Sequence, residues 1–423
     1  SLSYKRAKRG LPRCAGSWPL TSETPPREGI LVPPRTSLTS SAPRRGIHVI
    51  AAAALTSFAL LATGCASTPP VAAPTATSAA GDISTTLQAV LDDTRTEGGF
   101  PGVIARVITP DWTWDGASGT TGASTPVAPA PNDKARIGSV TKTMTATVLL
   151  QLVDEGLLSL DDTVSKYIAG IPNGDVATLR QVADMTSGIP SYSLNEQWQK
   201  TYFENPNAVW NSDQLVDAAR SMPPSFAPGD GWEYSNTNFM LLGVIFEQVL
   251  DKPVAEIFEE RIFEPLGMND TSFPAGSSEL TEPHLFGITE QGQPDGVTTD
   301  ATFWSPSFAF TAGEVISTID DLEKWAHALF TGEGVLSPEM QQLRRDSILR
   351  SPEPNNANSG YGIGWGDKDN WWGHTGEIPG FNTAVYHNYD TDTTVLIIVN
   401  SDIAMASGAP VTAVYNTLIA ALP

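Results

Sequence analysis

The spacing of apolar side chains divides the 423-residue chain into segments of different period. Residues 83–95 have the pattern of a helix, and residues 101–110 and 112–119 alternate enough to predict two paired strands. From residue 139 apolar side chains recur every four positions until Gly156, which is typical of a helix that ends at a glycine. The order predicted here is therefore helix, two strands, helix.

The centre and the end of the chain differ in period. Residues 157–330 are predicted to be helical segments and loops, with a dense apolar run over 239–250 and Pro253 in the first turn of the next helix. After Tyr361 the segments GIGW, WWGHTG, FNTAVYHNY and TTVLIIVN predict strands, and residues 409–422 predict a closing helix. Strands at both ends of a helical middle predict one sheet that both termini complete, with an inserted helical lobe.

The first part of the chain has the composition of an export signal. Arg44 and Arg45 precede an apolar run that ends at Cys65, and residues 44–64 are predicted to be a signal peptide. The stretch LATGC resembles the lipobox of bacterial lipoproteins, in which the cysteine is acylated. Alternatives are an ordinary signal peptide with an incidental cysteine, or a membrane anchor, which the short run and its His and Thr disfavour. We expect an exported protein, either a lipoprotein on the outer face of the cytoplasmic membrane or a secreted one.

Two segments flank this signal. Residues 1–43 are rich in Pro, Ser and Arg and precede the signal peptide, where no further segment is expected. We interpret them as a non-native or disordered extension. Residues 65–82 are rich in Pro, Ala, Ser and Thr, which predicts a lipid-anchored flexible linker and leaves 83–423 as the folded domain. Cys14 is the only other cysteine, so no disulfide is expected within that domain.

Charge excludes one class of partner. Of the 25 basic and 47 acidic residues, nine and two lie in residues 1–64, so the remainder has 16 basic and 45 acidic side chains and a net charge of −29. Such an acidic body repels phosphate backbones, and nucleic-acid binding is not expected. The five histidines have no metal-ligand spacing, His327 is interpreted as a helix-face residue, and no metal or cofactor is predicted.

One segment, RIGSVTK, contains the elements of an activated serine. Ser139 and Lys142 are three residues apart at a helix start, where they share a face and where free backbone N–H groups are available. A serine hydroxyl needs a proton acceptor, and the oxyanion that forms needs donors already aimed at it. The alternative is that Ser139 is an ordinary helix N-cap.

Two further motifs follow in the chain. Tyr234 to Asn236 (YSN) precede an apolar helix, and His374 to Gly376 (HTG) lie among the late strands. Alone, Tyr234 could be a core aromatic residue, Asn236 a helix cap and HTG a turn. A second YxN at Tyr386 is interpreted as sheet. The ordered set SxxK, YxN and HTG resembles the penicillin-recognising serine enzymes.

The resemblance extends over nearly all of residues 83–423. The segments IGSVTKTMTATVLLQLVDEGLLSLDDTV, PGDGWEYSNTNFMLLGVIFEQV and GHTGEIPGFNTAV are similar to the class C β-lactamase-like family, which includes secreted D-alanyl-D-alanine carboxypeptidases. The resemblance implies an α/β (α+β) fold of the β-lactamase/transpeptidase type, an antiparallel sheet flanked by helices with an α-helical lobe, about residues 157–330, and a cleft between them.

The resemblance also implies residue roles. Ser139 would be acylated, Lys142 and Tyr234 would share proton transfer, and Asn236 would hold the substrate amide and the lysine. The backbone N–H groups of Ser139 and Glu377 would form the oxyanion hole. His374, Thr375 and Gly376 would line the strand beside the substrate. A cationic Lys142 would favour the phenolate form of Tyr234.

One departure bears on the substrate. The characterised carboxypeptidases use an Arg near the HTG strand for the terminal carboxylate, whereas Lys368 is the one Lys or Arg in residues 351–423. Trp365, Trp371 and Trp372 flank this region, either as sheet packing or as an apolar wall for the substrate. We expect a D-alanyl-D-alanine carboxypeptidase-like enzyme acting on cell-wall peptides.

Two alternatives remain to that expectation. The first is an esterase, D-amino-acid amidase or β-lactamase of the same family. The second is a non-catalytic penicillin-binding or sensor lipoprotein. The expected partners are a small peptide, amide or ester, including the stem peptide of peptidoglycan, and a membrane through the lipid anchor only.

Overall fold

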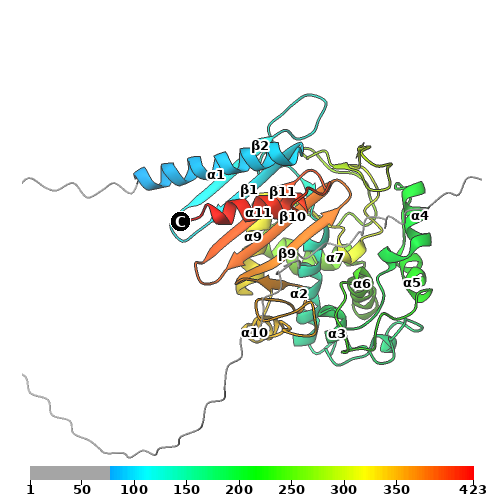
Figure 1. Ribbon diagram of the computed structural model, residues 1–423. Helices are drawn as coiled ribbons and strands as arrows, with labels where there is room; N and C mark the ends of the chain where they lie inside the picture. Colours follow the sequence, from blue (N-terminus) through cyan, green and yellow to red (C-terminus); the bar gives the residue numbers. More distant parts are fainter. Residues whose placement is uncertain (1–76) are drawn as a thin grey trace, which may run out of the picture. The chain divides into compact units, whose positions relative to one another are not determined.

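The computed structural model describes residues 77–423, and its centre is a seven-stranded antiparallel sheet (Figure 1). The strand order is β2-β1-β11-β10-β9-β8-β7. Its strands are β1 (Gly102–Ile108), β2 (Thr113–Gly119), β7 (Ser359–Tyr361), β8 (Gly366–Lys368), β9 (Trp371–Ile378), β10 (Phe381–Asn388) and β11 (Thr393–Val399). Strand β1 pairs with β11, with Val103 opposite Val399. The prediction of one sheet completed by both ends of the domain is therefore confirmed.

Helices α1 (Thr77–Gly98) and α11 (Pro410–Ala420) cover one face of the sheet (Figure 1). Their side chains Leu87, Leu91 and Val414 pack in one buried cluster with Val103 and Val399 of the central strands. Burying each such aliphatic side chain contributes about 1.5–3 kcal/mol. Because the central strands are buried on both faces, they read as nearly continuous apolar runs rather than as alternating ones.

The opposite face packs against the larger core, to which α2 (Thr141–Asp154) and α9 (Ile319–Thr331) belong. Strand β1 sends Ile104 into this core, while its neighbours point to the first face. Helix α9 contacts β1, β10 and β11, so it belongs with the sheet although the predicted lobe, about residues 157–330, includes it. The lobe therefore ends before α9.

The lobe is built around α6 (Asn236–Leu250), which is buried over most of its circumference, as its dense apolar run predicts. Pro253 is the N-cap of the next helix, one position before the predicted first turn. The other lobe helices are α3 (Leu179–Ala183), α4 (Glu196–Glu204), α5 (Ser212–Arg220), α7 (Val254–Phe258) and α8 (Glu264–Leu266), with a π-helical turn η4 (Glu259–Phe263). Helix α10 (Pro338–Asp346) contacts α2.

Short elements connect the sheet to the lobe. The 3₁₀ turns are η1 (Gly138–Val140), η2 (Val164–Lys166), η3 (Tyr192–Leu194) and η5 (Phe310–Ala312). Two small ribbons join β3 (Ala135–Arg136) to β6 (Ile316–Ser317) and β4 (Ile288–Thr289) to β5 (Thr299–Asp300). Turns η1 and η5 both adjoin α2, which places them at the boundary between sheet and lobe.

Two element predictions were wrong in detail. Helix α1 begins at Thr77 rather than 83, because the alanines at 79 and 80 favour a helix and no proline interrupts it. The segment GIGW is the turn between β7 and β8, since Gly364 has φ +70 and Gly362 donates its N–H to the carbonyl of Trp365.

The predictions for residues 1–43, for the signal peptide 44–64, for Cys65 and for most of the linker 65–82 lie outside the described residues. Within residues 77–423, no helix is both long and apolar enough to cross a membrane.

Candidate active site

Ser139 and Lys142 lie at the junction of η1 and α2. The chain leaves the 3₁₀ turn directly into the helix, so Lys142 falls one turn after Ser139 and its Nζ lies 2.9 Å from Ser139 Oγ. Lys142 Nζ also donates to the carbonyl of Ala312 in η5, at 2.7 Å. The Ser139 side chain borders a pocket, whereas that of Lys142 is 0% exposed. The structure thus joins the predicted pair directly.

Burial determines the charge of Lys142. Among the described residues, no carboxylate lies within 4.0 Å of its Nζ to form an ion pair. Moving an ammonium out of water without such a partner is costly, and burial lowers the pKa of Lys142 well below its usual value. A neutral amine next to Ser139 Oγ is a group that can accept the serine proton.

Tyr234 lies on the other side of this amine, in the loop before α6. Its ring centroid is 4.9 Å from Lys142 Nζ, and its hydroxyl is buried although the residue as a whole is half-buried. Burial raises the pKa of Tyr234, and the nearby Ser139 hydroxyl offsets only part of this effect. Burial therefore favours the neutral form of both groups, which is opposite to the expected phenolate.

The main chain of β9 approaches η1 at two glycines. A Cβ on Gly376 would lie 1.8 Å from the carbonyl oxygen of Ile137 and 3.1 Å from Ser139 N. A Cβ on Gly138, which has φ +52, would lie 2.7 Å from Glu377 N. Only glycine fits such spacing. The contact brings together the two backbone N–H groups, those of Ser139 and Glu377, from which an oxyanion hole is predicted.

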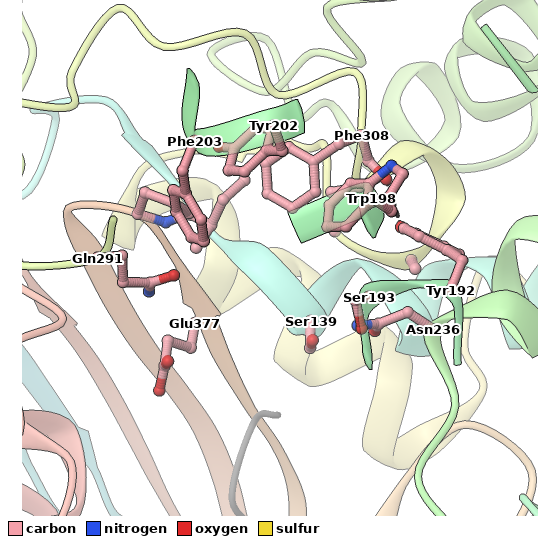
Figure 2. Close-up of a pocket in the computed structure, with 15 residues that line it drawn as sticks. Ser139, Tyr192, Ser193, Trp198, Tyr202, Phe203, Asn236, Gln291, Phe308 and Glu377 are labelled. Atoms are coloured by element: carbon pink, nitrogen blue, oxygen red, sulfur yellow. Dashed lines mark hydrogen bonds between the residues drawn. The ribbon is translucent and has the colours of Figure 1, made fainter. Parts of the chain in front are cut away.

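Asn236 borders the same pocket from the first turn of α6 (Figure 2). Its Nδ2 donates to Ser193 Oγ at 3.1 Å, and its backbone N–H donates to Ser191 Oγ at 3.1 Å. The N-cap of α6 is Ser235, so the alternative in which Asn236 caps this helix does not hold. Ser193 thus orients the side-chain amide of Asn236 at the pocket wall, while Ser191 holds its backbone, and no hydrogen bond joins Asn236 to Lys142 among those of the described residues.

His374 lies behind the reacting groups rather than in the pocket. Its side chain is 2% exposed, with Nε2 3.0 Å from the hydroxyl of Tyr361 and Nδ1 beside the carbonyl of Thr375. Burial, with Lys142 nearby, lowers the pKa of His374 to about 3. The described residues bordering the pocket do not include His374, so direct contact of its ring with substrate is not supported.

Thr375 and Lys368 meet in a different cavity of about 210 Å³, which Trp371 and Tyr415 also line. Neither side chain borders the pocket of Ser139. Arg350, the nearest preceding arginine in the sequence, is held by both carboxylate oxygens of Asp367. Among the described residues, no lysine or arginine therefore lines the Ser139 pocket, where a carboxypeptidase would need a cation for the substrate carboxylate.

The tryptophans near β9 serve as packing, the first of their two interpretations. Trp365 is 0% exposed and its ring lies under the guanidinium of Arg344 and beside Trp372. Trp371 packs edge-on against Tyr415. The second YxN lies in β10, as interpreted. His327 lies on α9, on the helix face as predicted, with its ring 2.9 Å from Glu333.

The aromatic wall of the pocket comes from elsewhere. Figure 2 shows a row of rings above Ser139, opposite Asn236 and Glu377. These rings belong to Tyr192, Trp198, Tyr202, Phe203 and Phe308. Sequence reasoning missed them, although Trp198 and Tyr202 stand four apart and share a helix face, where they stack at 5.3 Å.

An acidic group lies at the end of the pocket opposite Asn236. Figure 2 shows Glu377 and Gln291 there. Burial, followed by the charge of Asp402, raises the pKa of Glu377 to about 8, while Asn382 opposes the change. Gln291 donates to Asp402, whose own pKa is raised to about 6 by burial. This end of the pocket carries carboxyl groups and amides.

Two curated proteins are similar in sequence to part of this chain. It is 25% identical over 287 residues to Penicillin-binding protein 4* of Bacillus subtilis (strain 168), covering 64% of this chain and 61% of that protein. It is 27% identical over 286 residues to Protein flp of Staphylococcus aureus (strain N315), covering 65% and 54%. The chain therefore spans about half to three fifths of the length of these relatives.

Solved structures match more completely. The D-stereospecific amidohydrolase from Streptomyces sp. is 31% identical, with a TM-score of 0.71 over 80% of this chain and 99% of that chain. The D-amino acid amidase from Ochrobactrum anthropi SV3, solved with D-phenylalanine, is 26% identical, with a TM-score of 0.71 over 80% and 98%. The family model described as Beta-lactamase matches residues 87–414. Because that match runs from α1 to α11 and includes every element that builds the site, the chain belongs to the beta-lactamase family of penicillin-recognising serine hydrolases.

Proposed function

We propose that this protein hydrolyses amides or short peptides of D-amino acids with an apolar or aromatic side chain, through an acyl-enzyme on Ser139. The observation that carries the proposal is the pocket lining, which combines an aromatic wall with Glu377 and, among the described residues, no lysine or arginine. Such a lining suits an apolar side chain and gives a free carboxylate no cation to bind. The similarity to two hydrolases of D-amino-acid compounds supports it.

The proton transfers follow from two neutral groups. Lys142 takes the Ser139 proton as Oγ attacks the substrate carbonyl carbon, and the oxyanion faces the N–H groups of Ser139 and Glu377. Tyr234 gives its proton to the leaving nitrogen as the C–N bond breaks, and Lys142 then returns a proton to Tyr234. In the second half of the reaction water attacks the acyl carbon and gives its proton to Lys142. Tyr234 gives its proton to Ser139 Oγ as the ester C–O bond breaks, and Lys142 again returns a proton to Tyr234.

Two measurements test the proposal. A fluorophosphonate label should modify wild type and leave Ser139→Ala unlabelled, and equal labelling of both would reject the acyl-serine. D-phenylalanine amide should be hydrolysed faster than D-alanine is released from a Lys-D-Ala-D-Ala peptide. The reverse order would favour the carboxypeptidase, and turnover of a short p-nitrophenyl ester alone would favour an esterase. Absence of any turnover despite correct folding would favour a sensor.

We also propose that the protein is exported and anchored through Cys65. This proposal has its support in the sequence of residues 44–65 alone. Labelled fatty acid should be incorporated into wild type and not into Cys65→Ser, and a protein that stays in the cytoplasm would contradict it.

A further inference from the structure

The hydrogen bonds of His374 assign its tautomer. Nδ1 lies beside the carbonyl oxygen of Thr375, which can only accept, so Nδ1 carries the proton. Nε2 then has a lone pair, and the hydroxyl of Tyr361, 3.0 Å away, donates to it. His374 and Tyr361 are each 2% exposed. Tyr361 therefore supplies Nε2 with its hydrogen-bond donor in a place that solvent does not reach.

The surroundings favour a neutral imidazole. Burial is the main reason, and Arg344 on α10, together with Lys142 on α2 whenever Lys142 is protonated, disfavours a positive charge on His374 in the same sense. Tyr361 itself faces Tyr234, Arg344 and Asp184, and burial raises the pKa of Tyr361 so that it remains a donor. The rings of Tyr361 and His374 lie 6.2 and 6.1 Å from that of Tyr234. A charge on His374 would therefore act directly on the groups that move the serine proton.

We propose that Tyr361 is a positioning residue, which by donating to Nε2 fixes the tautomer and the orientation of the His374 ring behind Tyr234. This inference rests on the proposed acyl-serine chemistry, not on the identity of the substrate. Without the hydroxyl, Nε2 becomes a buried acceptor with no donor, so nothing holds the ring in this orientation. Loss of the Tyr361 hydroxyl should therefore let His374 change tautomer or rotate, and so disturb Tyr234 beside it.

The test compares Tyr361→Phe with Tyr389→Phe. Both remove a tyrosine hydroxyl, but that of the half-buried Tyr389 donates to the carbonyl of Phe330 and not to His374. The rate of Ser139 labelling is measured from pH 5 to 9. We expect Tyr361→Phe to lose at least about tenfold in labelling rate relative to wild type across this range, and Tyr389→Phe to remain close to wild type. Equal rates for all three proteins would overturn the proposal.

A second readout does not depend on activity. In protein with ¹⁵N-labelled histidine, His374 should show the neutral Nδ1–H tautomer throughout this pH range, and in Tyr361→Phe it should titrate or change tautomer. Wild type with the proton on Nε2 would overturn the proposal even if the variant does not fold. In a His374→Gln background, Tyr361→Phe should cause no further loss of rate, and an equal further loss would contradict a role through His374. Failure of all proteins to be labelled would instead reject the acyl-serine.

Discussion

Lys142 shows how a single buried side chain acquires a reactive state. An exposed lysine is an ammonium at neutral pH, but this one is fully buried and has no carboxylate within ion-pair distance among the described residues. The free energy of removing the charge from water lowers the pKa of Lys142, so the neutral amine is favoured. The same burial that stabilises α2 therefore creates a base beside Ser139.

Replacing Lys142 with arginine distinguishes a role of this residue as a base from a role as a fixed positive charge. A guanidinium stays protonated and cannot accept the serine proton. We expect Lys142→Arg to reduce the rate of Ser139 labelling by about 10²–10⁴-fold, the usual contribution of a general base. Lys142→Met should show a similar loss. If Lys142→Arg keeps most of the rate while Lys142→Met does not, Lys142 acts as a cation and the assignment fails.

At the scale of elements, two glycines determine how closely β9 and η1 approach. Gly138 has a positive φ, and its missing Cβ leaves room for the backbone of Glu377. Gly376 does the same for the carbonyl of Ile137. A difference of 1–2 Å here would move one predicted oxyanion donor away from the other, which is enough to reduce catalysis strongly.

Gly138→Ala and Gly156→Ala form a matched pair for this contact. Both glycines have positive φ, +52 and +71, so alanine strains the backbone at each by roughly 1–2 kcal/mol. A Cβ on Gly156 meets nothing within 4 Å, whereas one on Gly138 meets Glu377 N at 2.7 Å. We expect Gly138→Ala to lose at least about 100-fold in acylation, as for removal of one oxyanion donor. Gly156→Ala should remain close to wild type in rate, with a lower unfolding temperature.

Comparable losses in both variants would mean that backbone strain, and not the approach of β9, causes the effect. A folded Gly138→Ala with the wild-type acylation rate would show that the contact is not needed.

The aromatic wall of the pocket also depends on how separate elements are arranged. Helix α4 presents Trp198 and Tyr202 on its buried side, and the amphipathic pattern is visible in the sequence. What these rings face could not be derived from that pattern, because Phe308 comes from a loop about 100 residues later and completes the wall only in the folded state. Trp371 and Trp372, which are close to HTG in sequence, are instead half-buried and pack against the core.

For the whole molecule, buried acids make stability depend on pH. Glu314 is 1% exposed, and burial raises its pKa to about 7, although Gly276 N–H and Arg136 oppose this. The folded state then binds more protons than the unfolded state between pH 4.5 and 7, so this residue's contribution to stability is largest below pH 4.5. It is lost as pH rises through 7.

Glu314→Gln should remove that dependence. An amide keeps an oxygen that can accept from Gly276 but does not ionise. We expect its free energy of unfolding to be close to that of wild type at pH 5 and to exceed it at pH 8.5, by at most about 3 kcal/mol. Urea unfolding of both proteins at the two pH values measures this, with exposed Glu256→Gln as the control. A constant difference between the two pH values would contradict the assignment.

The sequence by itself determined most helices and strands and the types of reactive side chain at the site. Period-two and period-four patterns reflect local geometry, so β1, β2, α2, α6 and β9 to β11 were predictable, and Ser139 and Lys142 were predictable as a pair because one helical turn joins them. Exceptions were local too: in GIGW, Gly364 adopts a turn conformation that a strand pattern does not reveal.

Only the tertiary structure decided the protonation and the orientation of those groups. Charge depends on burial, which neighbours from distant segments create, and burial favours the neutral forms of Lys142 and Tyr234 where an ion pair was expected. Likewise, the alternation of side chains along β9 directs Thr375 toward a second cavity, and hydrogen bonds occupy both ring nitrogens of His374. The pocket takes its wall from Trp198 and Phe308 instead. Spacing along a chain constrains which atoms can meet, but desolvation and the path of the surrounding chain determine what they do there.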